Sequence, residues 1–383
     1  MRVAILTSDL RESFKTYAGP EPCMGIAPKA LLQGFAELRE AEVHVISCLQ
    51  QPVSAPEKLI GNIRYHSLHV PKIGWMRTLY QGCIRAVRKK LREIQPDIVH
   101  GQGTERDCAI SAAFSGFPNL VTVHGNMKAI ASFYRARPGS FFWLAARLET
   151  FALRKTGGVF CNSIYTENLV APVARRIWHV PNCLRREFFD SPAVASHDEL
   201  PVLLNVGLLS PYKRQTEILA LARRLWQRGL RFELQFAGAT ETRTSYGTDF
   251  MRQLAEAEKA GYARHLGSLP ADEMIAAFDR ASALIHFPTE ESFGLVVAEA
   301  LARNVKLFAA SVGGIVDVAN GVEGAELFPA QDWAGLENAV ARWFEANCPR
   351  PGAASETMRS RYSPEIVARR HLEIYREVLG QRR

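Results

Sequence analysis

The sequence predicts an α/β protein with two doubly wound domains, each built on a parallel β-sheet. Three observations lead to this fold class. The chain has 383 residues, which is enough for two domains. Short β-branched runs alternate with longer amphipathic stretches, as in strands connected by helices. The alternation occurs twice, and the strand candidates are apolar almost throughout, as expected for parallel sheets covered on both faces.

The first series of elements occupies residues 1–186. Its helix candidates place apolar residues at the spacing of one helix face. We expect helices at Ala27–Leu38, Thr78–Ile94 and Phe142–Arg154. We expect strands at Val3–Thr7, Val43–Ser47, Ile98–Gly101, Leu120–His124, Gly158–Asn162 and Trp178–Pro181.

The second series occupies residues 201–362. We expect its helices at Arg214–Gln227, Asp272–Phe278 and Trp333–Glu345. We expect its strands at Val202–Gly207, Phe232–Gly238, His265–Leu269, Ala283–Phe287, Lys306–Ala309 and Glu326–Phe328.

Two further segments complete the predicted organisation. Residues 187–200 show neither strand nor helix periodicity and carry Ser, Pro and acids, which is typical of a linker. Residues 363–383 are expected to form a C-terminal helix. Ser363 can cap it, and Pro364 suits the first helical position.

The composition excludes several classes of protein. A hydrophobic fraction of 47% with 22% charged residues argues against a disordered chain. No window approaches the roughly 18 apolar residues that span a bilayer, and the first apolar run is too short for a signal peptide. The seven cysteines form no CxxC motif and no cluster with zinc spacing. We therefore expect a reduced, cytoplasmic protein without a structural metal.

The clearest chemical signal lies in Pro288–Ala300, just after an expected strand. Ligands of open α/β sheets bind beyond the carboxyl ends of the strands. Phe293 and Gly294 open a helix, so the N–H groups of its first residues should form an anion site. Glu291 precedes this helix and Glu299 lies more than one turn into it. Carboxylates suit sugar hydroxyls, although two Glu residues alone are more often exposed acids of an amphipathic helix.

The wider context favours the functional interpretation. The spacing Glu291-x7-Glu299, with Phe293-Gly294-Leu295 inside it, resembles the signature of retaining glycosyltransferases of the GT-B fold, family 4. Other segments resemble further motifs of this family. They are Asn205–Arg214, Phe236–Gly238, Leu266–Gly267, Ser311–Asp317, Val180–Asn182 and Tyr362–Pro364.

The resemblance implies a fold and a division of labour. The fold would be GT-B, with two Rossmann-like domains facing across a cleft and the C-terminal helix returning to the first domain. Residues 1–186 would bind the acceptor, and residues 201–362 would bind a nucleotide-diphosphate sugar.

The resemblance also implies roles for matching residues. Glu291 would contact the hydroxyls of the donor sugar, Glu299 would hold the ribose, and Lys213 would neutralise the diphosphate. The N–H groups of Phe293–Leu295 would take the distal phosphate. The implied catalytic residues are His124, Lys213 and Glu291. The implied donor-binding residues are Gly25, Gly207, Lys213, Arg214, Gly238, Ser292, Phe293, Gly294, Leu295 and Glu299.

Some positions match the family less closely. His124 ends a strand and resembles the donor-site histidine, with a packed loop histidine as the alternative. Gly25 resembles the second residue of a Gly-Gly loop whose first position here is Met24. Leu208 stands where the family usually has a phosphate-binding Arg, and Arg214 is a candidate replacement.

The implied mechanism needs no enzyme nucleophile. No Ser-His-Asp set, metal motif or GxxxxGK[ST] loop is visible in the sequence. Lys213 and the helix N-terminus would hold the leaving diphosphate while the acceptor hydroxyl attacks from the same face, so anomeric configuration is retained. We expect no divalent metal and no cofactor, because the nucleotide sugar is itself the substrate.

The basic residues are concentrated in the first half of the chain. Of the net charge of +8, residues 1–186 contribute 25 Lys and Arg against 13 Asp and Glu. Trp75, Met76, Leu79 and Tyr80 are interleaved among the basic residues of this half. The hypothesis is peripheral docking on the anionic inner face of a membrane, with a solvated helix face as the alternative. The aromatic segment 133–144 would serve the same surface. The patch for the membrane or acceptor comprises Arg77, Arg85, Arg88, Lys89 and Lys90.

The sequence leaves several functions open. The first is a retaining glycosyltransferase acting on a glycan or lipid-linked acceptor, in bacterial cell-surface polysaccharide or glycolipid synthesis. The second is a nucleotide-sugar epimerase of the same fold, whereas a glycan phosphorylase would need bound pyridoxal and a longer chain. A nucleic-acid-binding protein is suggested by the pI of 9.2 but lacks a recognised motif, so no nucleic acid partner is expected. A nicotinamide enzyme is disfavoured because no GxGxxG follows a strand.

Overall fold

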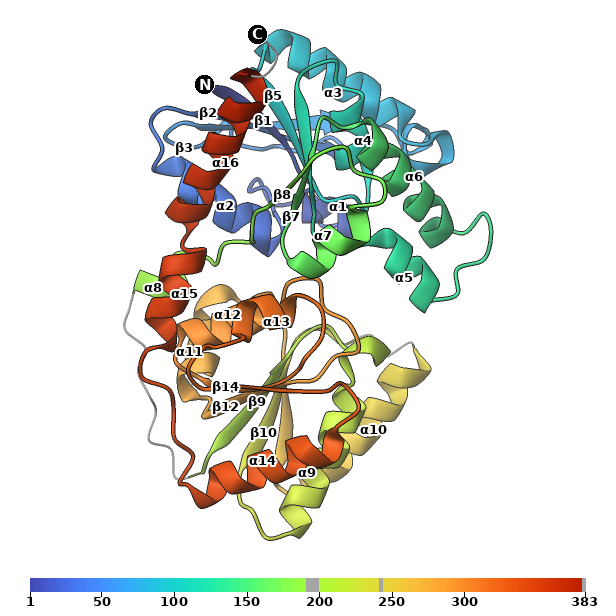
Figure 1. Cartoon of the computed structure of the whole chain (residues 1–383). Helices are drawn as coiled ribbons and strands as arrows, with labels where there is room; N and C mark the ends of the chain where they lie inside the picture. The colour runs from blue at the N-terminus through green and yellow to red at the C-terminus, as the bar shows by residue number, and fades with distance from the viewer. Residues whose placement is uncertain (191–199, 241–243, 381–383) are drawn as a thin grey trace. The chain divides into compact units, whose positions relative to one another are not determined.

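The computed structural model describes residues 1–190, 200–240 and 244–380 (Figure 1). These divide into two compact units, Met1–Arg185 with Tyr362–Arg383, and Arg186–Arg361. Each unit is an α/β structure on a predominantly parallel sheet, which confirms the predicted fold class. Most of the expected linker lies outside the described residues, but residues 187–190 form a short helix, α8 (Glu187–Asp190).

The first unit contains an eight-stranded sheet in the order β3-β4-β2-β1-β5-β6-β7-β8. All neighbouring strands are parallel except β3 and β4. The chain reverses its direction of travel across the sheet between β1 and β5, which is where such sheets bind ligands. The strands are β1 (Arg2–Leu6), β2 (Glu42–Leu49), β3 (Lys58–Ile60), β4 (Ile63–His69), β5 (Ile98–Gln102), β6 (Asn119–Val123), β7 (Val159–Cys161) and β8 (Ile177–His179).

Helices cover both faces of this sheet (Figure 1). The α-helices are α1 (Leu10–Phe14), α2 (Ile26–Ala36), α3 (Gln81–Ile94), α4 (Asp107–Ala113), α5 (Met127–Phe133), α6 (Phe141–Lys155), α7 (Ile164–Val170) and α16 (Pro364–Gly380). Two short 3-10 helices, η1 (Lys72–Gly74) and η2 (Met76–Thr78), precede α3.

The C-terminal helix α16 packs closely on α2, and Figure 1 shows the two side by side. Gly34 permits this approach, because a Cβ added there would lie 2.1 Å from the Pro364 carbonyl oxygen and 2.8 Å from Ala368 Cβ. Phe35 of α2 also stacks on Tyr375 of α16, with ring centroids 6.3 Å apart. The last helix of the chain is therefore part of the first unit.

The second unit contains a six-stranded, fully parallel sheet in the order β11-β10-β9-β12-β13-β14. This is the order of a dinucleotide-binding sheet, with its switch point between β9 and β12. The strands are β9 (Val202–Val206), β10 (Glu233–Ala237), β11 (Ala263–Gly267), β12 (Ala283–His286), β13 (Lys306–Ala310) and β14 (Ala325–Phe328). The helices after α8 are η3 (Pro211–Lys213), α9 (Gln215–Gln227), α10 (Ser245–Lys259), α11 (Ala271–Arg280), α12 (Leu295–Ala302), α13 (Gly314–Ala319), α14 (Trp333–Glu345) and α15 (Ala354–Tyr362).

Every expected strand has a counterpart, but some helices differ from the prediction. The helix expected at Thr78–Ile94 begins at Gln81, because Leu79 and Tyr80 both adopt left-handed φ values, 51° and 62°. The strands β3 and β4 were not expected. β3 is the edge strand and β4 lies between it and β2, and the partial burial of both leaves room for polar residues. Among the described residues, none of the helices combines the length and apolarity needed to cross a membrane.

Candidate functional site

Four loops meet at the carboxyl edge of the second sheet, and glycines make their contacts possible. A Cβ added to Gly238, after β10, would lie 2.1 Å from the carbonyl oxygen of Gly207, after β9. A Cβ added to Gly313, after β13, would lie 1.9 Å from the carbonyl oxygen of Glu291, after β12. The backbone of Gly314 also donates to Glu291 O at 2.9 Å. These contacts fix the loop that carries Glu291.

The side chain of Glu291 lies between a cation and an imidazole. The Lys213 ammonium forms an ion pair with Glu291 Oε2. His286 Nε2 lies 3.2 Å from the same oxygen. Thr289 N donates to Tyr212 O at 2.8 Å, which holds the Glu291 loop against the turn that carries Lys213. Residues that are 78 positions apart in sequence are thus joined at the switch point.

The electrostatics of this cluster keep Glu291 ionised. Burial alone would raise the pKa of this carboxyl, but the Lys213 charge and the His286 hydrogen bond lower it to about 2. Burial lowers the pKa of His286, which is 1% exposed, although Glu291 opposes that effect. At neutral pH the site therefore holds a carboxylate and a neutral imidazole next to the Lys213 side chain.

The N-terminal turn of α12 follows the loop that carries Glu291. Gly294 caps the helix with φ of 93°, a conformation that favours glycine, and the helix begins at Leu295. The first-turn N–H groups have no acceptors within their own helix, and the helix dipole favours an anion there. Of the three residues predicted to donate, Leu295 begins the helix, Gly294 caps it, and the side chain of Phe293 is buried just before it.

The other donor-site candidates occupy different positions. Glu299 is the fifth residue of α12 and is 4% exposed, and Ser292 is half-buried before the helix. Arg214 does not join the Lys213–Glu291 pair. Its guanidinium donates to Ala330 O at 2.6 Å. Leu208, which stands at the usual Arg position, is 53% exposed.

His286 is the residue of this cluster that the sequence analysis missed. It is the last residue of the buried strand β12, at the end of an otherwise apolar run. A polar side chain that ends such a strand, directly before a functional loop, was the available signal.

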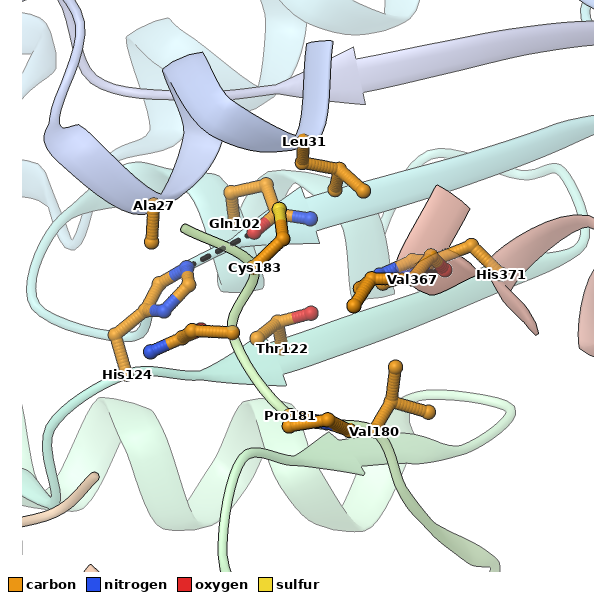
Figure 2. Close-up of a pocket in the computed structure, with 11 residues that line it drawn as sticks. Ala27, Leu31, Gln102, Thr122, His124, Val180, Pro181, Cys183, Val367 and His371 are labelled. Carbon is orange, nitrogen blue, oxygen red and sulfur yellow. Dashed lines mark hydrogen bonds between the residues drawn. The ribbon is translucent and has the colours of Figure 1, made fainter. Parts of the chain in front are cut away.

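The first unit has a separate pocket around His124 (Figure 2). Figure 2 shows the His124 ring directed at Gln102, and the Nε2 to Oε1 distance is 2.9 Å. Burial lowers the pKa of His124 to about 4, against an opposing effect of Asn182, so the ring is neutral at pH 7. The pocket is lined by Ala27, Leu31, Gln102, Thr122, His124, Val180, Pro181, Asn182, Cys183, Val367 and His371.

A buried carboxylate supports the loop that follows His124. Glu149 of α6 accepts hydrogen bonds from Thr104 Oγ1 at 2.5 Å and from Met127 N at 3.0 Å. It thereby joins the loop after β5 to the turn after β6. Burial raises the pKa of Glu149 to about 7. No sequence pattern singles out Glu149, because it lies inside an amphipathic helix.

Gly25 caps α2 with φ of −59°, and a Cβ there would lie 3.6 Å from Pro28 Cδ. This ordinary contact shows that the fold of the unit does not itself require glycine at this position. The preceding loop is held by Arg11, which pairs with Asp9 at 2.7 Å and donates to Gly19 O at 2.7 Å.

Four of the five basic residues of the predicted patch are exposed, but the expected aromatic residues are not exposed with them. Arg77, Arg85, Arg88 and Lys89 are exposed, whereas Lys90 is half-buried and pairs with Glu93 at 2.5 Å. In contrast, Trp75 and Tyr80 are buried, at 6% and 2% exposure, in the core beneath α3. Of the interleaved residues Leu79 is exposed, and Ile73, which was not expected, is exposed in the same segment.

Comparisons with known proteins agree with these two units. Residues 187–361 match the family model described as glycosyl transferases group 1. Residues 29–188 match the model described as Glycosyltransferase Family 4. The chain has the two domains of a glycosyltransferase. No curated protein sequence matches it.

Solved glycosyltransferase structures share the fold over nearly the whole chain. Sucrose-phosphate synthase from Thermosynechococcus elongatus is 17% identical, with 100% of both chains covered and a TM-score of 0.77. Anabaena HepE in complex with UDP-glucose is 16% identical, with 98% of this chain and 99% of that chain covered and a TM-score of 0.71. The lipopolysaccharide outer core galactosyltransferase WaaB is 15% identical, with 98% and 100% covered and a TM-score of 0.68. This glycosyltransferase therefore has the GT-B fold.

Proposed function

We propose that this glycosyltransferase is a retaining enzyme that moves a sugar from a nucleotide-diphosphate donor to a glycan or lipid-linked acceptor. The observation that carries the proposal is the Lys213–Glu291 pair beside the first turn of α12, at the switch point of the second sheet. A diphosphate needs a cation and N–H donors, and a sugar needs hydrogen-bond acceptors. This edge supplies both within one loop cluster.

The chemistry divides among the residues as follows. The Lys213 ammonium and the N–H groups that begin α12 stabilise the charge that develops on the leaving diphosphate. Glu291, ionised at neutral pH, accepts hydrogen bonds from the donor sugar and orients it. Glu299 holds the ribose. Gly207 and Gly238 let the backbone approach the nucleotide without side-chain obstruction.

In the transfer step, the bond from the anomeric carbon to the diphosphate oxygen breaks, and a bond to the acceptor oxygen forms on the same face. The proton of the acceptor hydroxyl passes to the leaving diphosphate oxygen. No enzyme nucleophile is used. The proposed role of the neutral His124 side chain is to bind the donor sugar. Because Lys213 and backbone N–H groups supply the positive charge, we expect transfer to continue after divalent ions are removed with a chelator.

The donor is proposed to be a UDP-sugar in the first instance. Support comes from the fold shared with Anabaena HepE, whose structure contains UDP-glucose, and with the galactosyltransferase WaaB. The likeness to WaaB also supports a role in bacterial cell-surface polysaccharide or lipopolysaccharide synthesis.

The transfer proposal is tested by donor turnover. UDP release from a panel of UDP-sugars should be measurable and should fall below detection in Glu291→Ala, while Glu273→Ala, an exposed acid on α11, should match the wild type. Full activity of Glu291→Ala would refute the role of this residue. Conversion of one nucleotide sugar into another without acceptor would identify an epimerase instead.

We further propose that the first unit docks peripherally on an anionic membrane, at the inner face of the cytoplasmic membrane. The exposed Arg77, Arg85, Arg88 and Lys89, with Ile73 at 72% exposure, support this. On α5 and α6, Phe133, Tyr134 and Phe141 are 43%, 47% and 47% exposed and supply further apolar contact. Basic residues near an anionic bilayer contribute about 1 kcal/mol each.

Vesicle cosedimentation tests the docking proposal. Reversal of Arg85, Arg88, Lys89 and Lys90 to Glu should abolish binding to vesicles that contain phosphatidylserine. Reversal of Arg369, Arg370 and Arg376 on α16 is the control and should bind nearly as the wild type does. Equal binding of both variants would refute the assigned surface.

A further inference from the structure

Two thiols and a carboxylate converge inside the first unit, outside every residue assigned to transfer or membrane docking. They belong to Cys48 on β2, Cys83 on α3 and Asp107 on α4. One donor atom of each lies within 4.8 Å of the other two. No segment of the sequence suggests this cluster, because its members are far apart along the chain.

The fold brings these residues together at one place. Cys48 is the penultimate residue of β2, Cys83 lies in the first turn of α3, and Asp107 is the first residue of α4. All three are buried, with 5%, 0% and 5% of their surface exposed. Their surroundings are the apolar core that includes Trp75 and Tyr80. A carboxyl group in such a core requires a compensating partner.

We propose that Cys48, Cys83 and Asp107 bind one thiophilic divalent cation, with zinc as the physiological candidate. Two sulfur ligands and one oxygen ligand suit zinc, cadmium or cobalt and disfavour magnesium or calcium. Zinc at about 2.3 Å from sulfur and about 2.1 Å from oxygen places tetrahedral ligands about 3.5 to 3.8 Å apart, so the donor atoms need to approach by only about 1 Å.

Binding releases the two thiol protons to solvent, because the thiolate is the metal ligand. The neighbouring Cys108 is directed elsewhere, since its Sγ lies 3.8 Å from Ser8 Oγ. The three side chains thus supply three of the four ligands of a tetrahedral site. The ion joins β2, α3 and α4, and so fixes the start of the helix that carries the basic patch.

Optical titration tests the proposal on the full-length reduced protein. Cobalt should give the visible absorption of a tetrahedral thiolate site, saturating at one ion per chain, and zinc should displace it. Cys48→Ser, Cys83→Ser and Asp107→Asn should each weaken binding by more than about 100-fold, because even outer-shell partners of a metal cost about 10- to 100-fold. A wild type without this absorption would overturn the proposal.

Cys161→Ser is the matched control, because Cys161 is 0% exposed and lies in the same apolar core. It should bind cobalt as the wild type does, and zinc should raise the Tm of both. If the cluster variants fold poorly, wild-type alkylation in mild denaturant still decides the matter. Zinc should then protect Cys48 and Cys83 selectively, and equal labelling with and without zinc would contradict the site.

Discussion

Replacement of Lys213 by Met should show how strongly the donor-site ion pair stabilises the second unit. In the folded protein the pKa of Glu291 is about 2, against an ordinary value of 4.5. This difference corresponds to about 3 kcal/mol of folding free energy at neutral pH. Because Lys213 is the largest of the stabilising influences on the carboxylate, the variant should lose about 2 kcal/mol or more at pH 7.

The destabilisation by Lys213→Met should depend on pH in a definite direction. A carboxyl group whose pKa is lowered by folding stabilises the folded state fully at a pH above its ordinary pKa. That stabilisation is lost as the pH falls through the pKa of the group in the folded protein. The difference between wild type and Lys213→Met should thus be largest near pH 7 and fall to less than half by about pH 3. Differential scanning calorimetry at several pH values, following the transition of the second unit, measures it.

A double-mutant cycle supplies the control. Glu291→Gln removes the charge that Lys213 stabilises. Adding Lys213→Met to this variant should therefore lower the free energy of unfolding much less than it does in the wild type. The reasoning fails if Lys213→Met is as stable as the wild type, or if its destabilisation is the same at pH 3 and at pH 7.

Three further predictions concern backbone contacts and a buried acid. Gly313→Ala should reduce donor turnover by at least about tenfold by displacing the Glu291 loop, whereas Gly321→Ala, also at positive φ but with no atom within 4 Å, should keep wild-type kinetics. Gly34→Ala should destabilise the first unit by about 1 to 3 kcal/mol in urea unfolding, because its Cβ collides with Pro364; an unchanged midpoint would contradict the helix packing. Burial raises the pKa of Glu149 to about 7 from 4.5. As the pH rises through this range, ionisation of the buried group therefore lowers the free energy of unfolding by up to about 3 kcal/mol. Glu149→Gln should therefore gain Tm relative to the wild type between pH 5 and 8, and parallel Tm curves would refute this.

The fold could be predicted from sequence wherever burial leaves a simple pattern. Strands such as β9 and β12 are buried, and apart from Asn205 and His286 their residues are apolar, so their position is evident. The strand β4, next to the edge strand β3, is only partly buried and mixes polar with apolar residues, so the sequence pattern does not reveal it. The helix α4 spans seven residues, too few for its periodicity to stand out.

The candidate site was predictable only in part, for a related reason. Glu291 and Lys213 could be found because each follows a strand within a characteristic motif, and the structure joins them directly. His286 was missed because it ends a buried strand, and Glu149 because its role depends on two loops that are distant in sequence. Trp75 and Tyr80 were placed on a surface because a linear segment does not reveal which of its side chains face the core.

The most direct test of the central claim is nucleotide binding, measured by thermal shift and calorimetric titration with UDP, GDP and ADP and their sugar conjugates. At least one nucleotide-diphosphate sugar should raise the Tm of the wild type by mass action. Lys213→Met should bind the same ligand at least about tenfold more weakly, since it lacks a charge-assisted contact to the diphosphate. No response to any of these nucleotides, or equal affinity in Lys213→Met, would contradict a diphosphate site at this edge of the sheet.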